Sequence, residues 1–237
     1  MTLRAIATVS PRVSAWVRLG SVGAVVVLVP MALNPALSQE PDPARAARWM
    51  DDLMWGHGHV GGPFALIDHT GRKRTDADFR GKLLIVYFGY TTCPDVCPTD
   101  LIQISLAINK LGTAGENIQP LFVSLDPERD TPSVLARYVS TFHPRLIGLT
   151  GTPEQVRAVA DSYKAYYAKY VPPDRAVDVI DHTGLIYLVG RDGQYIGFFP
   201  PGTSADRLLE IIRPYLAHHQ VGQRRGPGSA FILSGGR

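Results

Sequence analysis

The chain contains two cysteines, Cys93 and Cys97, which are separated by three residues. A structural disulfide stabilises a fold most when it closes a long loop, so a bridge across this short span would contribute little. Chemistry at the sulfur atoms is therefore the more economical reason for the pair. A thiolate is both a nucleophile and a ligand for soft metals, so the pair is compatible with thiol–disulfide exchange and with metal binding.

The residues around the cysteines favour convergent thiolates. The pair follows an apolar run at 83–88, and Pro98 suits the first position of a helix, so Cys97 falls at or beside the N-cap. A helix N-terminus stabilises negative charge and lowers the pKa of a thiol. Thioredoxin-type redox pairs have two intervening residues, whereas this pair has three, and a proline follows each cysteine. Because proline biases the preceding residue towards an extended conformation, we expect the sulfurs on a fixed loop, where both could bind a soft ion such as Cu(I).

Two sulfurs leave Cu(I) short of ligands, and His182 is the best candidate for a third. It precedes an expected strand at 185–189, and in a thioredoxin topology the loop that enters this strand faces the cysteine loop. That loop normally carries a cis-proline, but this chain has no proline between Pro173 and Pro200 and offers a histidine instead. A solvated or hydrogen-bonded core histidine is the ordinary interpretation. Because His182 is expected to lie opposite the two sulfurs, we favour a role as a metal ligand for it.

The elements that must position these residues alternate between strand and helix. Hydrophobic runs and turn signals predict strands at 64–67, 83–88, 120–125 and 146–149, and a hairpin from 185–189 and 195–199. Capping residues and prolines predict a helical turn at 75–81 and helices at 98–111, 131–142, 152–167 and 204–216. The stretch 172–181 is expected to be irregular. This order predicts an α/β, thioredoxin-like fold, with a central mixed sheet flanked by helices.

The two ends of the chain differ from its middle. Residues 1–38 combine three arginines, no acid and an apolar stretch, so we expect a signal peptide or a membrane anchor, with cleavage left open. Residues 39–60 are expected to be a linker, residues 61–216 the thioredoxin-like domain, and residues 217–237 a disordered tail. Positive-inside orientation then places the domain on the periplasmic side of the inner membrane.

The charge distribution argues against nucleic-acid binding. The net charge is +3, but 1–38 and 217–237 carry six arginines and no acid, which leaves 18 basic against 21 acidic residues in 39–216. A domain with this balance lacks the basic footprint of a nucleic-acid binding protein.

Four segments resemble the signatures of the SCO/SenC family of copper-binding proteins, which are needed to assemble the dinuclear copper centre of cytochrome c oxidase. They are 61–71, 87–98, 124–132 and 181–183, in order, within about residues 60–216. The resemblance implies a thioredoxin-like fold and Cu(I) or Cu(II) held by Cys93, Cys97 and His182. It also implies delivery to the copper-bearing oxidase subunit, with another periplasmic copper chaperone as a candidate donor. Thr183 stands where many members have serine.

Two acidic residues are candidates for support of the site, and two other functions stay open. Asp126, at the end of an expected strand, could orient the cysteine loop, and Asp181 could hold the His182 imidazole.

As a copper carrier the protein is a binding and transfer protein rather than an enzyme. A thiol–disulfide oxidoreductase would instead cycle Cys93 and Cys97 to reduce the copper-site cysteines of the oxidase. A thiol peroxidase ranks last.

Overall fold

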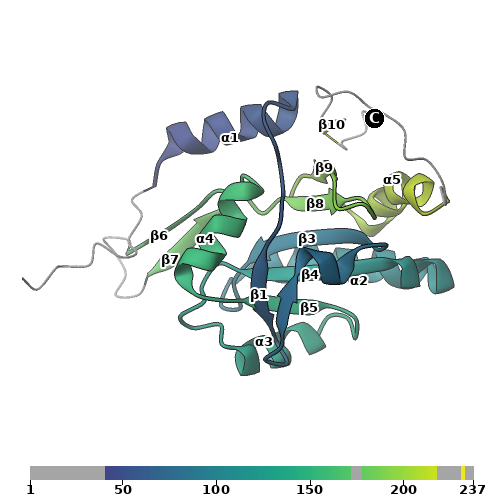
Figure 1. Ribbon diagram of the computed structural model, residues 1–237, viewed down its shortest axis with the longest axis horizontal. Coiled ribbons are helices and arrows are strands. Elements are labelled where there is room, and N and C mark those ends of the chain that lie inside the picture. Colours follow the sequence, from purple (N-terminus) through teal and green to yellow (C-terminus); the bar gives the residue numbers. More distant parts are fainter. Residues whose placement is uncertain (1–40, 172–177, 218–230, 233–237) are drawn as a thin grey trace, which may run out of the picture. The chain divides into compact units, whose positions relative to one another are not determined.

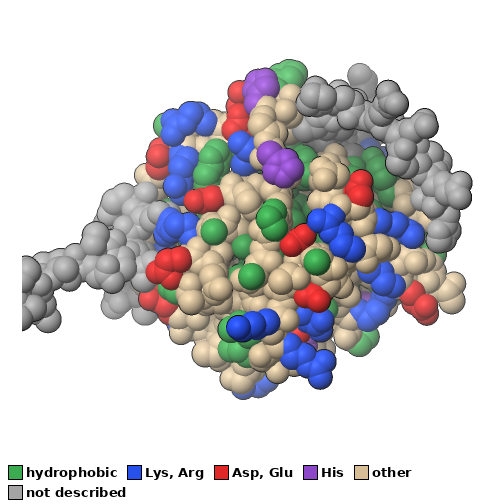
Figure 2. All heavy atoms as spheres, in the orientation of Figure 1, with side chains coloured by type: hydrophobic (Ala, Val, Ile, Leu, Met, Phe, Trp, Pro, Cys, Tyr) green, Lys and Arg blue, Asp and Glu red, His purple; other side chains and the backbone are tan. Residues whose placement is uncertain are grey.

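The computed structural model describes residues 41–171, 178–217 and 231–232 (Figure 1). The expected signal or anchor segment at 1–38 lies outside the described residues, as does most of the expected tail at 217–237. Among the described residues, no helix has the length and apolar character needed to cross a membrane. Lys, Arg, Asp and Glu side chains are interspersed over the described part of the face shown in Figure 2.

A mixed sheet forms the centre of the fold, with the strand order β10-β9-β8-β3-β4-β5-β1-β2 among the described residues. The strands are β1 (Ala65–Asp68), β2 (Lys73–Thr75), β3 (Leu83–Gly89), β4 (Ile118–Ser124), β5 (Ile147–Thr150), β8 (Ile186–Val189), β9 (Tyr195–Phe199) and β10 (Phe231–Ile232). β3, β4 and β5 are parallel, whereas β8 pairs antiparallel with β3 and β1 antiparallel with β5. The predicted fold class is confirmed.

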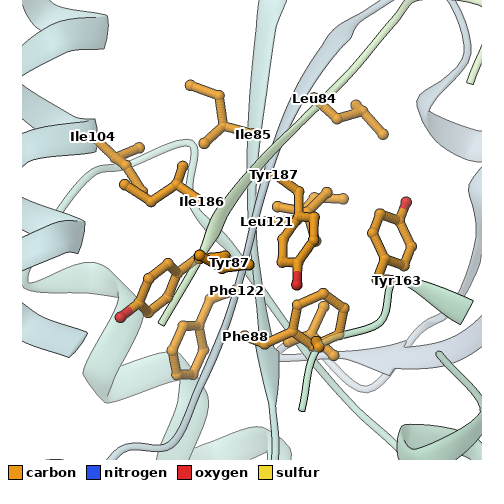
Figure 3. Close-up of a cluster of buried hydrophobic side chains, with 14 of the residues drawn as sticks. Leu84, Ile85, Tyr87, Phe88, Ile104, Leu121, Phe122, Tyr163, Ile186 and Tyr187 are labelled. Carbon is orange, nitrogen blue, oxygen red and sulfur yellow. The ribbon is translucent and has the colours of Figure 1, made fainter. Parts of the chain in front are cut away.

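β3 lies in the middle of the core, and all seven of its residues are buried. Successive side chains of a strand point to opposite faces, and Figure 3 shows the consequence. Tyr87 lies on one face with Phe122, at 6.5 Å between ring centroids. Phe88 lies on the other face, with its ring 5.4 Å from that of Tyr163 and 5.6 Å from that of Tyr187. The apolar run therefore fills both layers between sheet and helices.

Helices cover the sheet, and two of them begin directly after capping threonines. They are α2 (Val96–Lys110), α3 (Pro132–Ser140), α4 (Pro153–Ser162) and α5 (Ala205–Ala217), with 3-10 turns η1 (Asp76–Phe79) and η2 (Gly112–Asn117). Thr131 caps α3 by accepting from the Val134 N–H, and Thr152 forms a capping box with Gln155 at α4. α2 packs against α5, and α3 packs on β5.

One hairpin departs from the prediction. The helix expected to reach residue 167 ends at Ser162, and Lys164 adopts a left-handed conformation with φ of 55°. The chain then forms β6 (Tyr167–Tyr170), which pairs antiparallel with β7 (Val179–His182). Part of the stretch expected to be irregular is therefore a strand. This two-stranded sheet is separate from the main sheet and lies at the left of Figure 1.

A helix also occupies the stretch expected to be a linker. α1 (Pro43–Trp55) begins after Asp42, whose side chain accepts from the Arg45 N–H, and ends at Gly56, which is left-handed. Leu53 is only 1% exposed, so α1 contributes to the core. β10, within the expected tail, pairs with β9. The division at residues 60 and 217 stays a prediction.

Candidate metal centre

The two sulfurs lie where β3 gives way to α2. Cys93 is in the connecting loop and its backbone N–H donates to the Tyr90 carbonyl at 3.2 Å, whereas Cys97 is the second residue of α2. Both are free thiols, with Cys93 8% exposed and Cys97 fully buried. Gly89 makes room for the buried sulfur, because a Cβ at this position would lie 2.7 Å from Cys97 Sγ. The helix begins two residues earlier than expected, so Cys97 lies within its first turn.

His182 meets the sulfurs from the separate hairpin. It is the last residue of β7, and its Nε2 lies 3.4 Å from Cys97 Sγ. The Gly184 N–H donates to His182 Nδ1 at 3.1 Å, so the neutral ring carries its proton on Nε2, towards the sulfur. Gly184 has a φ of 59°, a left-handed conformation that favours glycine. The ligand atoms of Cys93, Cys97 and His182 all lie within 4.8 Å of one another, as the sequence predicts.

Two tyrosine rings enclose the imidazole. The centroid of Tyr90 lies 5.9 Å from that of His182, and the centroid of Tyr87 lies at 6.4 Å, each nearly perpendicular to the imidazole. The Tyr87 hydroxyl donates to Asp100 Oδ2 at 3.2 Å, and Asp100 Oδ1 accepts from the Gly202 N–H at 2.8 Å. Asp100 is fully buried on α2. This buried carboxylate thus connects the wall of the site to the loop before α5.

The two thiols share one proton. Cys97 donates to Cys93, and this hydrogen bond, reinforced by one from His182, lowers the pKa of Cys93 despite its burial. The same hydrogen bond, together with burial, raises the pKa of Cys97. Burial and the nearby sulfurs raise the pKa of Tyr90 to about 12, so its phenol stays protonated. Of the two sulfurs, Cys93 is therefore the one that loses its proton first.

The two expected supporting acids do not contact the ligands. Asp126 is 1% exposed, but its carboxylate pairs with Arg129 and Lys169. Asp181 is exposed, and it is the Gly184 backbone that fixes the imidazole. A supporting role for either acid stays a prediction.

Asp130 is the acid that holds the cysteine loop. Its carboxylate accepts from the Thr91 N–H at 3.0 Å, from the Thr91 hydroxyl at 2.5 Å and from the Ser124 hydroxyl at 2.6 Å. Sequence reasoning missed both this residue and Asp100. Asp130 precedes the capping residue Thr131 and resembles a turn acid, while Asp100 resembles an acid in the first turn of a helix. The spacing of three between Cys97 and Asp100, which places both on one helix face, was the available signal.

The donor set suits a soft or borderline metal. Thiolates select Cu(I) and zinc, and imidazole suits both, whereas two sulfurs and one nitrogen are a poor site for Mg²⁺ or Ca²⁺. Among the described residues, these three form the group of His, Cys, Asp or Glu side chains that could hold a metal ion.

The chain is similar to known proteins in sequence and in fold. A family model described as SCO1/SenC matches residues 54–217. The human mitochondrial SCO1 homolog is 43% identical over 163 residues, which are 66% of this chain and 54% of that protein, so the match spans about half the relative's length.

Two solved structures with copper bound resemble the chain closely. Bradyrhizobium japonicum ScoI is 40% identical with a TM-score of 0.61, and the match covers 66% of this chain and 99% of that one. Arabidopsis thaliana ScoI is 38% identical with a TM-score of 0.63, and the match covers 68% and 99%.

Proposed function

Because the chain belongs to the SCO1/SenC family, we propose that it binds copper through Cys93, Cys97 and His182 and delivers it during assembly of cytochrome c oxidase. The observation that carries the proposal is the approach of the three donors, which come from two separate parts of the chain, to within 4.8 Å of one another. Related proteins of this fold have been solved with copper bound, which supports copper as the metal.

Copper is the cargo, and its release proceeds by ligand exchange without a change of oxidation state. Each incoming thiolate of an acceptor replaces one of the three donors. The order follows from burial: His182 is partly exposed, Cys93 is 8% exposed and Cys97 is fully buried. An acceptor therefore reaches copper from the side of His182 and Cys93, and the bond to Cys97 breaks last.

The proposed partner is the copper-bearing subunit of cytochrome c oxidase, with another periplasmic copper chaperone as a candidate donor. The proposed location is the periplasmic side of the inner membrane, with residues 1–38 as signal or anchor. Residues 61–216 act as the copper-binding domain in this proposal.

A titration of the reduced protein with Cu(I), in competition with a chelator of known affinity, tests the proposal. We expect one Cu(I) per chain and a large loss of affinity in Cys93→Ser, Cys97→Ser and His182→Ala. His57→Ala, which removes a well-exposed histidine, is the matched control and keeps wild-type affinity. A parallel titration with Zn²⁺ separates the two metals that the donor set admits. Wild-type Cu(I) affinity in Cys93→Ser and His182→Ala would exclude the site.

The lowered pKa of Cys93 favours a second candidate, a thiol–disulfide oxidoreductase. The Cys93 thiolate would attack a substrate disulfide and release one thiolate. Cys97 would then lose its proton to the leaving group and displace the second thiolate, so that two electrons pass to the substrate and a Cys93–Cys97 disulfide remains. A thiol reductant must then regenerate the pair. Reduction of a disulfide substrate that survives His182→Ala would support this activity, whereas the copper carrier requires the histidine.

A further inference from the structure

The three ligands belong to two different parts of the structure. Cys93 lies in the loop between β3 of the main sheet and α2, and Cys97 lies in the first turn of α2, whereas His182 is on the two-stranded β6–β7 sheet, which is separate from the main sheet. The metal site therefore requires that this hairpin be held at a defined position.

A group of five charged residues joins the hairpin to the main sheet. Asp126, Glu128 and Arg129 lie in the loop after β4, Lys169 lies on β6, and Asp178 lies directly before β7. Arg129 binds both carboxylate oxygens of Asp178, with N···O distances of 2.6 and 3.1 Å. Lys169 Nζ reaches Asp126 at 3.1 Å, Glu128 at 2.5 Å and Asp178 at 3.2 Å. Arg129 also pairs with Asp126.

Three of the five side chains in this group are largely buried, whereas those of Arg129 and Glu128 are 41% and 48% exposed. The Asp126 side chain is 1% exposed, and those of Lys169 and Asp178 are 18% and 23% exposed. A buried carboxylate needs its cations, because an unpaired charge out of water is costly. The bidentate Arg129 pair lowers the pKa of Asp178 to about 2, so this residue is ionised at neutral pH. Both strands of the hairpin are thereby held to the loop after β4.

The pairing register of β6 and β7 determines where His182 lies relative to Lys169 and Asp178. Lys169 pairs with Ile180, and Tyr167, two residues earlier, pairs with His182. A shift of one residue in register would turn the His182 side chain to the opposite face of the hairpin. Fixing Lys169 and Asp178 therefore fixes which way the imidazole points.

We infer that Asp126, Glu128, Arg129, Lys169 and Asp178 form a hairpin clamp that positions His182 over the two sulfurs. The inference rests on the proposed copper site. It gives Asp126 a role on the histidine side of the centre, since Asp130 already holds the cysteine loop.

The experiment is a double-mutant cycle measured by Cu(I) competition. Lys169→Gln removes the cation that contacts three carboxylates, and we expect affinity to fall on the order of tenfold, as for other residues that orient a metal ligand. Lys169→Arg, which keeps the charge, restores most of the affinity. Lys110→Gln, which breaks the exposed pair with Asp206, leaves affinity unchanged.

The histidine-free background separates positioning from general stability. With His182→Ala already present, Lys169→Gln should cause no further loss, because the clamp acts through the imidazole. An equal loss in both backgrounds would overturn the clamp. Arg129→Gln, at a more exposed position, serves as a second variant if Lys169→Gln does not fold.

A measurement without copper keeps this inference distinguishable from the proposed function. We expect Lys169→Gln to accelerate amide hydrogen exchange in β6 and β7 while leaving β3 and β4 unchanged. Unchanged exchange in the hairpin would overturn the clamp even in a protein that binds copper. Failure of the wild-type protein to bind copper would instead defeat the proposed function, whatever the exchange data show.

Discussion

At the scale of single residues, the site needs room for the Cys97 sulfur as much as it needs suitable ligand atoms. A Cβ at Gly89 would lie 2.7 Å from Cys97 Sγ, 3.0 Å from Phe122 and 3.1 Å from Tyr87. These neighbours are buried, so none can move away freely. We expect Gly89→Ala to displace the Cys97 sulfur, to weaken Cu(I) binding and to destabilise the fold by about 1–3 kcal/mol.

Gly148→Ala provides the matched control for this substitution. Its Cβ would lie 3.0 Å from Val139 and 3.2 Å from Leu135, in the packing between α3 and β5 and away from the ligands. Urea unfolding and Cu(I) competition measure the two effects separately. The steric argument fails if the two variants bind copper equally well.

The shared proton leads to a pH prediction at the same scale. An ordinary thiol, with a pKa of about 8.5, loses reactivity as the pH falls below that value. Cys93 has a lowered pKa, so in the reduced, metal-free protein it should stay a thiolate and react with iodoacetamide well below pH 8.5. Cys97, whose pKa is raised, should react slowly throughout. Mass spectrometry of the alkylated peptides against pH measures both rates.

Cys97→Ala removes the donor that stabilises the Cys93 thiolate, so reaction at Cys93 should shift towards higher pH in this variant. A Cys93 rate that already follows an ordinary thiol titration in the wild-type protein would contradict the shared proton.

At the scale of elements, the sequence predicted the strands and helices whose positions depend on local interactions. The apolar run of β3 predicted the strand, and the caps at Thr131 and Thr152 predicted where α3 and α4 begin, each to within a few residues. The β6–β7 hairpin was missed because its tyrosine-containing strand continues a helical pattern. The helix ends instead at the left-handed Lys164, and Tyr163 and Tyr167 are buried by tertiary packing, which sequence periodicity does not reveal.

The candidate site shows the same contrast between features that the local sequence predicts and features that depend on tertiary packing. The two cysteines and His182 were predictable from residue type, spacing and their expected place in the topology. Asp130 was not, because it reaches Thr91 across 39 residues of sequence. The supporting contact of Asp100 with Tyr87 was hidden for a different reason: one residue resembled a helix-start acid and the other a member of an apolar strand. Long-range polar contacts are decided by the packed structure.

At the scale of the whole molecule, the proposed copper site would link copper binding to folding unequally through its three donors. The cysteines are separated by three residues, so an unfolded chain also presents both sulfurs to copper. His182 lies 85 residues from Cys97 and reaches it only in the folded protein. A ligand stabilises a fold only to the extent that it binds the folded state better than the unfolded one.

Copper should therefore stabilise the wild-type protein mainly through His182. At a free Cu(I) concentration of about a hundred times Kd, binding to the folded state alone would add about 2.7 kcal/mol to the free energy of unfolding. We expect part of this increase in the wild-type protein and little in His182→Ala, because there copper binds the same two sulfurs in both states. Thermal unfolding with and without Cu(I), under reducing conditions, measures the difference. Equal increases in melting temperature for the two proteins would show that the imidazole adds nothing to copper binding in the folded chain.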